Sequence, residues 1–382
     1  MKILYLVTDD SFFWSHRRPL ASAARDAGCE VVVATPPGEY RARIEAEGFR
    51  FAPVGMARSR NPVRVLMSFF AVFRLYRRER PDLVHHVSMR PVILGGLAAR
   101  LAAVPARVDL VTGLGWVFTS GSRWLRFLVE RAYRIALGGR RGWTVFQNPD
   151  DREHFVSRGL VDPARSSVIL GSGVDVERLS ARPEPRGTPR VVLAARMLEH
   201  KGVGDLVEAG RILRERGVPH RIVLAGRPDE ENPASIPAEQ LEAWDAEGIV
   251  EWVGHREDVE HLLADSHVAC LPSYYREGLP KFLLEALALG RPVVTTDMPG
   301  CREAVRGGEN GILVPPRRPT ELADALERLL SDPEARRVMG QASRALARRC
   351  FAEPVVVGET LAIYKRQVGS LWPNGEAAGS AR

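Results

Sequence analysis

Lysine is scarce in this chain of 382 residues. Of its 54 Lys and Arg residues, four are lysine: Lys2, Lys201, Lys281 and Lys365. Since nearly all cationic side chains here are arginine, each lysine places a compact ammonium group where this chain otherwise uses a planar guanidinium. Lys201 follows an apolar run and precedes a helical pattern, and cations at the carboxyl end of such a strand suit phosphate. The alternative is that Lys201 and Lys281 are ordinary surface residues.

Cysteine and long apolar runs are also scarce. The four cysteines form no C-x-x-C pair and no evenly spaced framework, which argues against structural zinc and favours a reducing compartment. No apolar run approaches the roughly 18–20 residues that a membrane-spanning helix needs. Residues 1–10 are typical of a first strand and its loop rather than of a signal peptide. We therefore expect a cytoplasmic protein.

Two motifs that would indicate other chemistry are missing. Residues 8–17, after the first predicted strand, contain no glycine, which argues against a dinucleotide-dependent hydride-transfer enzyme. No D-x-D pattern occurs, so a metal that holds a diphosphate would have no evident ligands. Arg196, Lys201 and a helix N-terminus can carry that charge instead. We expect neither a metal nor a cofactor.

The composition and the hydrophobic pattern indicate two α/β domains. The length exceeds one typical core, and 45% hydrophobic with 26% charged residues is an ordinary globular composition. Short buried strands alternate with helices throughout, which favours two Rossmann-like, doubly wound parallel sheets that face a ligand cleft. We predict strands at residues 3–7, 31–34, 83–85, 108–112, 144–147, 167–170, 191–195, 221–225, 250–253, 268–271, 292–296 and 311–314.

Proline and glycine suggest the domain boundaries. The Pro-rich segment 181–189 is the strongest linker signal, and it separates an N-terminal domain, residues 1–182, from a C-terminal domain, residues 188–352. The amphipathic segment 353–370 is predicted to form a final helix. Residues 373–382 are rich in Gly, Ala and Ser and are expected to form a disordered tail.

Positive charge belongs to the first half of the chain. Residues 1–185 hold 28 Lys and Arg against 18 Asp and Glu, whereas residues 186–382 hold 26 against 29. The excess concentrates in two segments, 63–80 and 122–143, which mix arginines with large apolar side chains and favour helices on an anionic membrane surface. Nucleic acid is the rival partner, but no nucleic-acid motif accompanies the charge, and we expect none to bind. Core-packed helices with solvated arginines remain the alternative.

The segment from Glu277 to Glu285 is the most informative stretch. Glu277 lies in a loop with Gly and Pro, and Glu285 lies about one turn into the predicted helix 281–289. The start of that helix directs free N–H groups and the positive end of its dipole at the loop. An anion site flanked by two hydroxyl-binding carboxylates is what a nucleotide-diphosphate sugar requires. The alternative is a surface helix with solvated glutamates, since short motifs match by chance.

At these residues the chain resembles the retaining glycosyltransferases of family 4, within them the CapM-like capsular-polysaccharide branch. The resemblance covers about the first 365 residues and is carried by the E-x7-E segment with its continuation to 303, and by residues 112–121, 146–151, 171–175 and 229–233. It implies the GT-B fold, with helix 353–370 crossing back to the N-terminal domain. It also implies transfer of a sugar from a nucleotide-diphosphate donor, UDP-linked, to a polyprenyl-diphosphate-linked glycan in capsule, O-antigen or exopolysaccharide synthesis.

The resemblance implies roles for individual residues. Glu285 would hold the ribose hydroxyls, and Glu277 the hydroxyls of the transferred sugar. Arg196 and Lys201 would hold the diphosphate. The backbone N–H groups of Gly278 and Leu279, with Lys281 beside them, would also contact the sugar donor. Its nucleobase would lie in a pocket formed by Gly254, His255 and Arg256.

One position departs from the family pattern. Many family 4 enzymes have a His near the anomeric carbon where this chain has Thr112, so we expect no His-assisted mechanism. Retention would instead rest on front-face attack, with the departing diphosphate accepting the proton of the acceptor. We place Thr112 and Gly113 on the acceptor side and add His16 and Arg17, from the glycine-free first loop, as acceptor contacts. The alternative for His16 is a helix-capping role.

Two other functional classes stay open at this point. A nucleotide-sugar 2-epimerase shares the two-domain fold, but the basic helices of the first half would then have no purpose. A non-catalytic membrane-bound scaffold would leave Glu277, Arg196 and Lys201 without a role. Incubation with the donor alone separates the first alternative, because an epimerase yields an isomer and a transferase yields at most slow hydrolysis.

Overall fold

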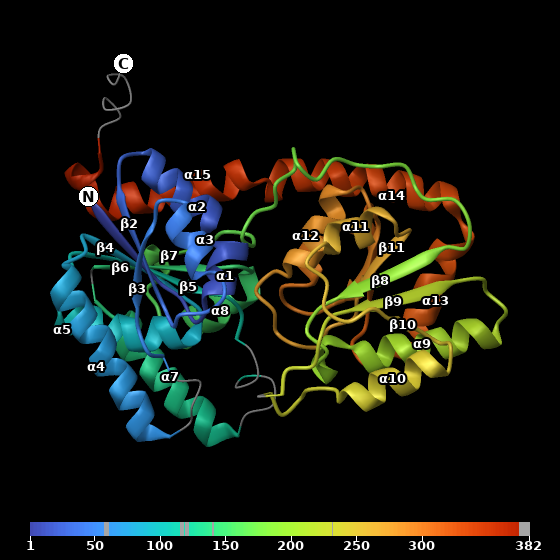
Figure 1. Ribbon diagram of the computed structural model, residues 1–382, viewed down its shortest axis with the longest axis horizontal. Helices are drawn as coiled ribbons and strands as arrows, with labels where there is room; N and C mark the ends of the chain where they lie inside the picture. Colours follow the sequence, from blue (N-terminus) through green and yellow to red (C-terminus); the bar gives the residue numbers. More distant parts are fainter. Residues whose placement is uncertain (57–60, 115–117, 119–121, 140, 231, 374–382) are drawn as a thin grey trace, which may run out of the picture. The chain divides into compact units, whose positions relative to one another are not determined.

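The computed structural model describes residues 1–382 except 57–60, 115–117, 119–121, 140, 231 and 374–382 (Figure 1). The chain forms two compact units: unit 1 consists of Met1–Ser172 and Pro354–Arg382, and unit 2 of Gly173–Glu353. Each unit has its own parallel sheet, so the predicted fold class of two doubly wound α/β sheets is confirmed. Residues 374–382 of the predicted disordered tail, 373–382, lie outside the described residues, as do parts of segments 112–121, 122–143 and 229–233.

The sheet of unit 1 has seven parallel strands in the order β3-β2-β1-β4-β5-β6-β7. Their bounds are β1 (Lys2–Leu6), β2 (Glu30–Thr35), β3 (Arg50–Pro53), β4 (Leu83–Val87), β5 (Ala106–Val111), β6 (Gly142–Phe146) and β7 (Ser166–Val168). The strand order reverses between β1 and β4. Loops that leave the carboxyl ends of these two strands diverge there, and open parallel sheets bind ligands at such a point.

Helices cover both faces of this sheet because its strands are apolar on both sides. Ile3 and Tyr5 of β1 belong to one core cluster, whereas Leu4 and Leu6 belong to another. This alternation is the two-residue period of a strand buried between two helical layers. The helices are α1 (Asp10–His16), α2 (Arg18–Asp26), α3 (Arg41–Ala46), α4 (Pro62–Glu79), η1 (Pro91–Gly95), α5 (Gly96–Leu101), α7 (Arg123–Leu137), α8 (Pro149–Ser157) and η2 (Pro163–Arg165).

The last long helix, α15 (Glu353–Val368), completes unit 1 (Figure 1). Its residues Val356, Ile363 and Tyr364 are buried in the same cluster as Ile3 and Tyr5. The Tyr364 hydroxyl lies 2.7 Å from His85 Nδ1 and donates to the Tyr5 hydroxyl at 3.2 Å. A short turn, η6 (Gly369–Leu371), follows it. The first residues of the chain therefore share one core with its final helix.

The sheet of unit 2 has six parallel strands in the order β10-β9-β8-β11-β12-β13. The strands are β8 (Arg190–Ala194), β9 (Arg221–Ala225), β10 (Glu251–Trp252), β11 (Val268–Leu271), β12 (Val293–Thr296) and β13 (Gly311–Val314). The helices are η3 (Glu199–Lys201), α9 (Val203–Glu215), α10 (Ala238–Ala246), α11 (Val259–Ala264), α12 (Lys281–Ala288), η4 (Arg302–Ala304), α13 (Pro319–Ser331), α14 (Pro333–Leu346) and η5 (Ala347–Phe351). The order reverses between β8 and β11.

Two features of the chain path differ from the sequence analysis. Strand β3 was not predicted, because its four residues end in proline and form only the edge of the sheet. The division between the units falls at Ser172, ahead of the Pro-rich segment. Residues just after it belong to unit 2 because the Arg344 guanidinium donates to the carbonyl oxygens of Val176 and Leu179.

Candidate active site

Two loops that flank the strand reversal of unit 2 bring predicted catalytic residues together. The loop after β8 carries Lys201, and the loop after β11 carries Glu277. Lys201 Nζ lies 2.5 Å from Glu277 Oε1, and the two side chains are 14% and 13% exposed. The Ser273 hydroxyl donates to the same carboxylate oxygen at 3.0 Å. Two donors therefore hold Glu277 in one orientation at the carboxyl edge of the sheet.

Two glycines let the loops of this site approach each other. Gly202 has φ +76°, and a Cβ there would lie 2.1 Å from the Pro272 carbonyl oxygen. Gly300 has φ +89°, and a Cβ there would lie 2.5 Å from the Glu277 carbonyl oxygen. Both positions need the left-handed backbone and the missing side chain that only glycine offers. The Lys201–Glu277 contact depends on this close approach.

Glu285 lies in α12, where it faces several charges. Its carboxylate is 3.7 Å from the Lys281 ammonium, so Lys281 is an ion-pair partner of a predicted donor-binding residue. Burial raises the pKa of the Glu285 carboxyl above its ordinary value, and Lys281 opposes this shift. Glu260 raises the pKa further, whereas Arg178, which pairs with Glu260, lowers it. The carboxylate is therefore partly desolvated and suited to accept hydrogen bonds from hydroxyl groups.

Arg196 is more exposed than Lys201 and Glu277, and it pairs with a different carboxylate. Its side chain is 57% exposed, and its Nη1 lies 2.6 Å from Asp229 Oδ2. Asp229 is itself fixed, because its backbone N–H donates to the Ser235 hydroxyl at 2.9 Å. A guanidinium held at one end and open to solvent at the other retains donors for an incoming anion.

The residues predicted for a nucleobase pocket follow β10. The Gly226 N–H donates to the Gly254 carbonyl at 2.7 Å, which joins the loops after β9 and β10. Gly254 has φ +67° and is partly exposed, and a Cβ built on it would meet no atom within 4 Å. Arg256 donates two hydrogen bonds to the Asp258 carboxylate, of 2.7 and 2.6 Å. His255, which lies between Gly254 and Arg256 in the sequence, is exposed.

The two acceptor contacts predicted in a first loop lie at the end of helix α1 instead, and they differ in burial. His16 is partly exposed and stacks on Phe12 with 4.1 Å between ring centroids. Arg17 is 3% exposed, and its Nε and Nη2 have no hydrogen-bond partner among the described residues. Burial lowers the pKa of Arg17 to about 10, and the charges of Tyr364 and Tyr5 oppose this. Arg17 is therefore buried within unit 1, whereas His16 is partly exposed.

Thr112 and Gly113 leave the carboxyl end of β5. The Thr112 hydroxyl donates to the Ser88 hydroxyl at 3.1 Å, and Ser88 follows β4 with φ +77°. Gly113 has φ +98°, which turns the chain sharply at the end of the strand. The segment that follows lies partly outside the described residues.

Comparisons with known proteins decide the family. The family model "Glycosyl transferase 4-like" matches residues 2–137, and "Glycosyl transferases group 1" matches residues 175–346. The chain is 30% identical to the putative glycosyltransferase EpsD of Bacillus subtilis over 390 residues, which covers 95% of this chain and 96% of that protein. The chain belongs to the family 4-type glycosyltransferases with the GT-B fold.

Two further similarities concern a named activity and a solved structure. The glycosyltransferase is 27% identical over 385 residues to the N,N'-diacetylbacillosaminyl-diphospho-undecaprenol alpha-1,3-N-acetylgalactosaminyltransferase of Campylobacter jejuni, covering 96% of this chain and 99% of that protein. The Anabaena protein HepE, solved in complex with UDP, superposes with a TM-score of 0.77 at 18% identity over 96% of this chain and all of that one. At that identity HepE supports the shared fold alone.

The sequence analysis missed several residues that shape the site of this glycosyltransferase. Ser273 binds Glu277, Asp229 binds Arg196, and Arg178 approaches Glu285 from a segment more than a hundred residues earlier in the chain. His200 stacks on Tyr275 with 4.3 Å between ring centroids, and burial lowers its pKa to about 4. Ser273 alone had a local signal, since it follows a buried strand; the others depend on three-dimensional proximity.

Proposed function

We propose that the chain is a retaining glycosyltransferase that moves a hexosyl unit from a UDP-sugar to a glycan built on a polyprenyl diphosphate. The observation that carries this proposal is the Lys201–Glu277 pair at the strand reversal of unit 2, because it joins a phosphate-binding cation to a hydroxyl-binding carboxylate. The printed name of the Campylobacter relative supports a polyprenyl-diphosphate acceptor. The printed name of an Escherichia coli relative that is 26% identical over 295 residues, UDP-Gal:alpha-D-GlcNAc-diphosphoundecaprenol alpha-1,3-galactosyltransferase, supports a UDP-linked donor.

In this proposal the donor binds along the carboxyl edge of the unit 2 sheet. Glu285 accepts hydrogen bonds from the ribose hydroxyls, and Lys281 sets the orientation of its carboxylate. Lys201 and Arg196 bind the diphosphate, joined by the backbone N–H groups of Gly278 and Leu279 just before α12. The nucleobase lies against the partly exposed backbone at Gly254, beside His255 and Arg256.

The proposed transfer retains the configuration of the anomeric carbon. The acceptor oxygen forms a bond to that carbon on the face from which the diphosphate oxygen departs, and the departing oxygen takes the acceptor proton. Negative charge grows on the diphosphate as the bond breaks, and Lys201 and Arg196 stabilise it. Glu277 binds hydroxyls of the transferred sugar and fixes its orientation. These two cations replace a divalent metal, so we propose a metal-independent reaction.

Unit 1 supplies the acceptor side. Its partly exposed candidates are Thr112, which directly follows β5, and His16, which ends the helix that follows β1. Open parallel sheets bind ligands at the carboxyl ends of their strands. We propose that the hydroxyl and imidazole groups there bind hydroxyls of the acceptor glycan. Gly113 lets the backbone approach it.

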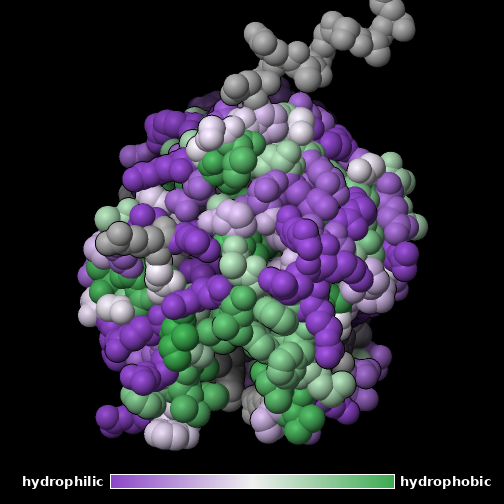
Figure 2. Space-filling view, turned by 90° about the vertical axis from the view of Figure 1, so that its left-hand side faces the viewer, coloured by the Kyte–Doolittle hydropathy of each residue, from purple (hydrophilic) through white to green (hydrophobic). Residues whose placement is uncertain are grey.

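We also propose that unit 1 binds an anionic membrane surface, on the cytoplasmic face. The first half of α4 exposes Val63, Leu66, Met67 and Phe70, and the first half of α7 exposes Trp124, Phe127 and Leu128, all by 45% or more. Figure 2 shows these apolar side chains gathered at the lower edge of unit 1, with hydrophilic residues above them. Exposed apolar residues beside arginines suit lipid headgroups and acyl chains. None of the described helices is both long and apolar enough to span a bilayer.

A transfer assay tests the function. The purified protein would be incubated with a panel of UDP-sugars, with and without a polyprenyl-diphosphate-linked glycan, and the anomeric configuration of the product determined by NMR. We expect a new α-linkage from an α-linked donor only when the acceptor is present. Isomerisation of the donor alone would establish the epimerase instead, and absence of any turnover together with donor binding would favour a scaffold.

A further inference from the structure

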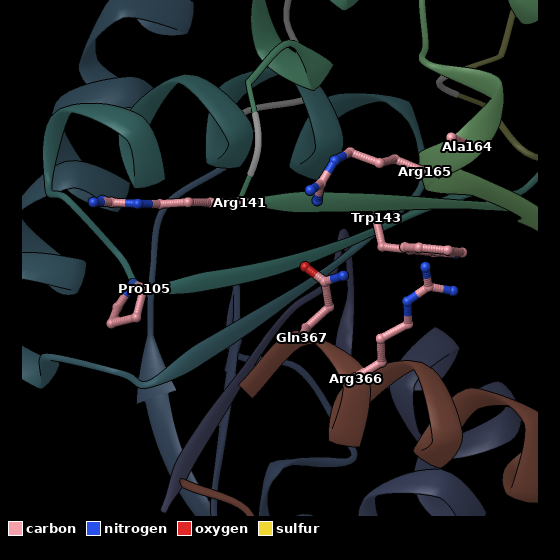
Figure 3. Close-up of a pocket in the computed structure, with 7 residues that line it drawn as sticks. All are labelled: Pro105, Arg141, Trp143, Ala164, Arg165, Arg366 and Gln367. Atoms are coloured by element: carbon pink, nitrogen blue, oxygen red, sulfur yellow. The ribbon is translucent and has the colours of Figure 1, made fainter. Parts of the chain in front are cut away.

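A cavity of about 470 Å³ lies at the edge of the unit 1 sheet opposite the acceptor candidates. Pro105 precedes β5, Arg165 precedes β7 and Trp143 is the second residue of β6, so the cavity lies at the amino ends of these strands. Arg366 and Gln367 reach it from the last turn of α15 (Figure 3). The glycosyltransferase reaction described above uses none of these residues.

The lining of this cavity is strongly basic. It contains Arg141, Arg165 and Arg366, and no carboxylate is among the residues that line it in the described part of the chain. Figure 3 shows Arg165 and Gln367 extending toward each other from opposite sides. Arginine near a helix C-terminus also complements the helix dipole, which explains one such cation at the end of α15. Two further arginines, Arg141 and Arg165, line the same cavity from the segments before β6 and β7.

One of the three guanidinium groups is held in place without any anion. Arg366 lies over the Trp143 ring, with its Cζ 4.4 Å from the ring centroid. The indole is fixed in turn, because Trp143 Nε1 donates to the Ser167 hydroxyl at 3.0 Å. When a guanidinium lies over an aromatic ring, its N–H groups point outward in the plane of the guanidinium. A tetrahedral oxyanion can accept hydrogen bonds from two of these N–H groups. The site is therefore partly organised before any ligand binds.

A second cavity of about 460 Å³ adjoins the first, and Arg165 lines both. Gly142 lines the second cavity, and Arg107 lies behind it: a Cβ on Gly142 would be 2.5 Å from Arg107 Nη2. Arg107 is 4% exposed, and this Nη2 has no hydrogen-bond partner among the described residues. Arg107 is paired with the buried Asp109, because its Nε lies 2.6 Å from Asp109 Oδ2, and Asp162 also lines the second cavity. The basic lining without a carboxylate is therefore that of the first cavity.

We propose that this amino-edge cavity is a binding site for a phosphate monoester or diphosphate group, distinct from the donor site of unit 2. Arg165 and Arg366 bind the phosphate oxygens from two sides, Gln367 donates its amide N–H, and Arg141 contributes charge at the rim. Such an anion connects the last turn of α15 to the strands β6 and β7. Binding therefore strengthens the attachment of α15, the segment by which the chain returns from unit 2 to unit 1.

Calorimetric titration with sodium pyrophosphate at constant ionic strength tests the site. The titration uses the full chain carrying Arg196→Ala and Lys201→Ala, so that the proposed donor site contributes no diphosphate binding. We expect saturable binding with one pyrophosphate per chain and a rise in unfolding temperature. In the same background, Arg165→Gln and Arg366→Gln should each weaken binding about tenfold, the effect of one lost charge-assisted hydrogen bond.

The controls separate this site from general charge effects. Arg306→Gln removes an exposed arginine of unit 2 and should leave the affinity unchanged. Gln367→Ala, which removes no charge, should still weaken binding and serves if an arginine variant fails to fold. Absence of saturable binding, or equal affinity in the Arg165 and Arg366 variants, would overturn the proposal.

Sedimentation with vesicles identifies the source of the phosphate. Vesicles of phosphatidylcholine with phosphatidic acid would be compared with and without Arg165→Gln, both in a chain that carries Trp124→Glu to weaken the proposed membrane contact of α7. If Arg165→Gln abolishes sedimentation, the cavity takes a lipid headgroup. If sedimentation is unchanged while pyrophosphate binding falls, the cavity takes a soluble phosphate compound. Because pyrophosphate binding is measured without the donor site, failure of the proposed transfer activity leaves this result unaffected.

Discussion

Replacing Lys201 with methionine removes the cation of the Lys201–Glu277 pair while keeping most of the side-chain volume. Two effects should follow. The first is a loss of kcat/KM on the order of 10²–10³, because one group that stabilises growing charge on the leaving diphosphate is missing. The second is a loss of stability, because the Glu277 carboxylate, 13% exposed, keeps the Ser273 hydroxyl but loses its counterion.

The size of the stability loss follows from the burial of the pair. An exposed ion pair contributes about 0–1 kcal/mol. A largely buried carboxylate that loses a partner costs about 1–3 kcal/mol. For a unit of this size, roughly 3 °C in unfolding temperature corresponds to 1 kcal/mol, so we expect a decrease of about 3–9 °C. Adding Glu277→Gln to the Lys201→Met variant should restore part of the stability, because no unpaired buried charge then remains. It should restore none of the activity.

The measurement is a double-mutant cycle of thermal unfolding and of kcat/KM across Lys201→Met, Glu277→Gln and the combined variant. Lys365→Met is the matched control, since this lysine lies over the Trp372 ring in unit 1. The control should retain full activity. The reasoning is refuted if the stability losses of the two single variants simply add, or if Lys201→Met keeps near-normal turnover.

Four further outcomes are expected. Gly202→Ala should lower both activity and unfolding temperature, because its Cβ would lie 2.1 Å from a carbonyl oxygen, whereas Gly204→Ala in helix α9 meets no atom within 4 Å and should stabilise the protein slightly. Burial raises the pKa of Glu285, so the stability linked to its protonated form is fully present below the ordinary value of 4.5 and is lost as pH rises through the raised value. Glu285→Gln should therefore unfold at a higher temperature than the parent at pH 7, with no difference near pH 4, while its KM for the donor increases. Trp124→Glu should reduce sedimentation with anionic vesicles. The matched control Val338→Glu makes the same change at an exposed apolar residue of unit 2 and should not reduce it. EDTA should leave most of the transfer activity intact. If EDTA abolishes the activity and a divalent ion then restores it fully, the metal-independent mechanism is contradicted.

Local pattern made much of the fold predictable from the sequence. The strands of both sheets are continuous apolar runs bounded by loops, as in residues 3–7 and 191–195, and such runs need no knowledge of distant residues. The strand β3 escaped prediction because its four residues, Arg50–Pro53, carry one polar and one proline residue and gain their pairing only from β2. The end of unit 1 at Ser172 escaped because it depends on contacts with residues near 350, which no local composition reveals.

The same distinction applies to the site. Lys201 and Glu277 could be found because each follows a strand in a recognisable loop, and the strand reversal then brings their side chains together. Arg17 could not be placed, because the sequence shows a basic loop residue but not that the side chain turns inward toward Tyr5 and Tyr364. Ion-pair partners such as Asp229 depend on which loops meet, and spacing along the chain does not determine that.

The path of the chain also has a consequence for biosynthesis. Unit 2 is in effect an insertion between the first 172 residues and helix α15, so its whole sequence emerges from the ribosome before unit 1 can be completed. Until residues near 364 are made, Tyr5 and His85 lack the buried hydroxyl that joins them. The usual order, in which the amino-terminal domain folds first, is then reversed. The second unit of the nascent chain can fold while the first, whose seven strands have all been made, still lacks the last helix of its core.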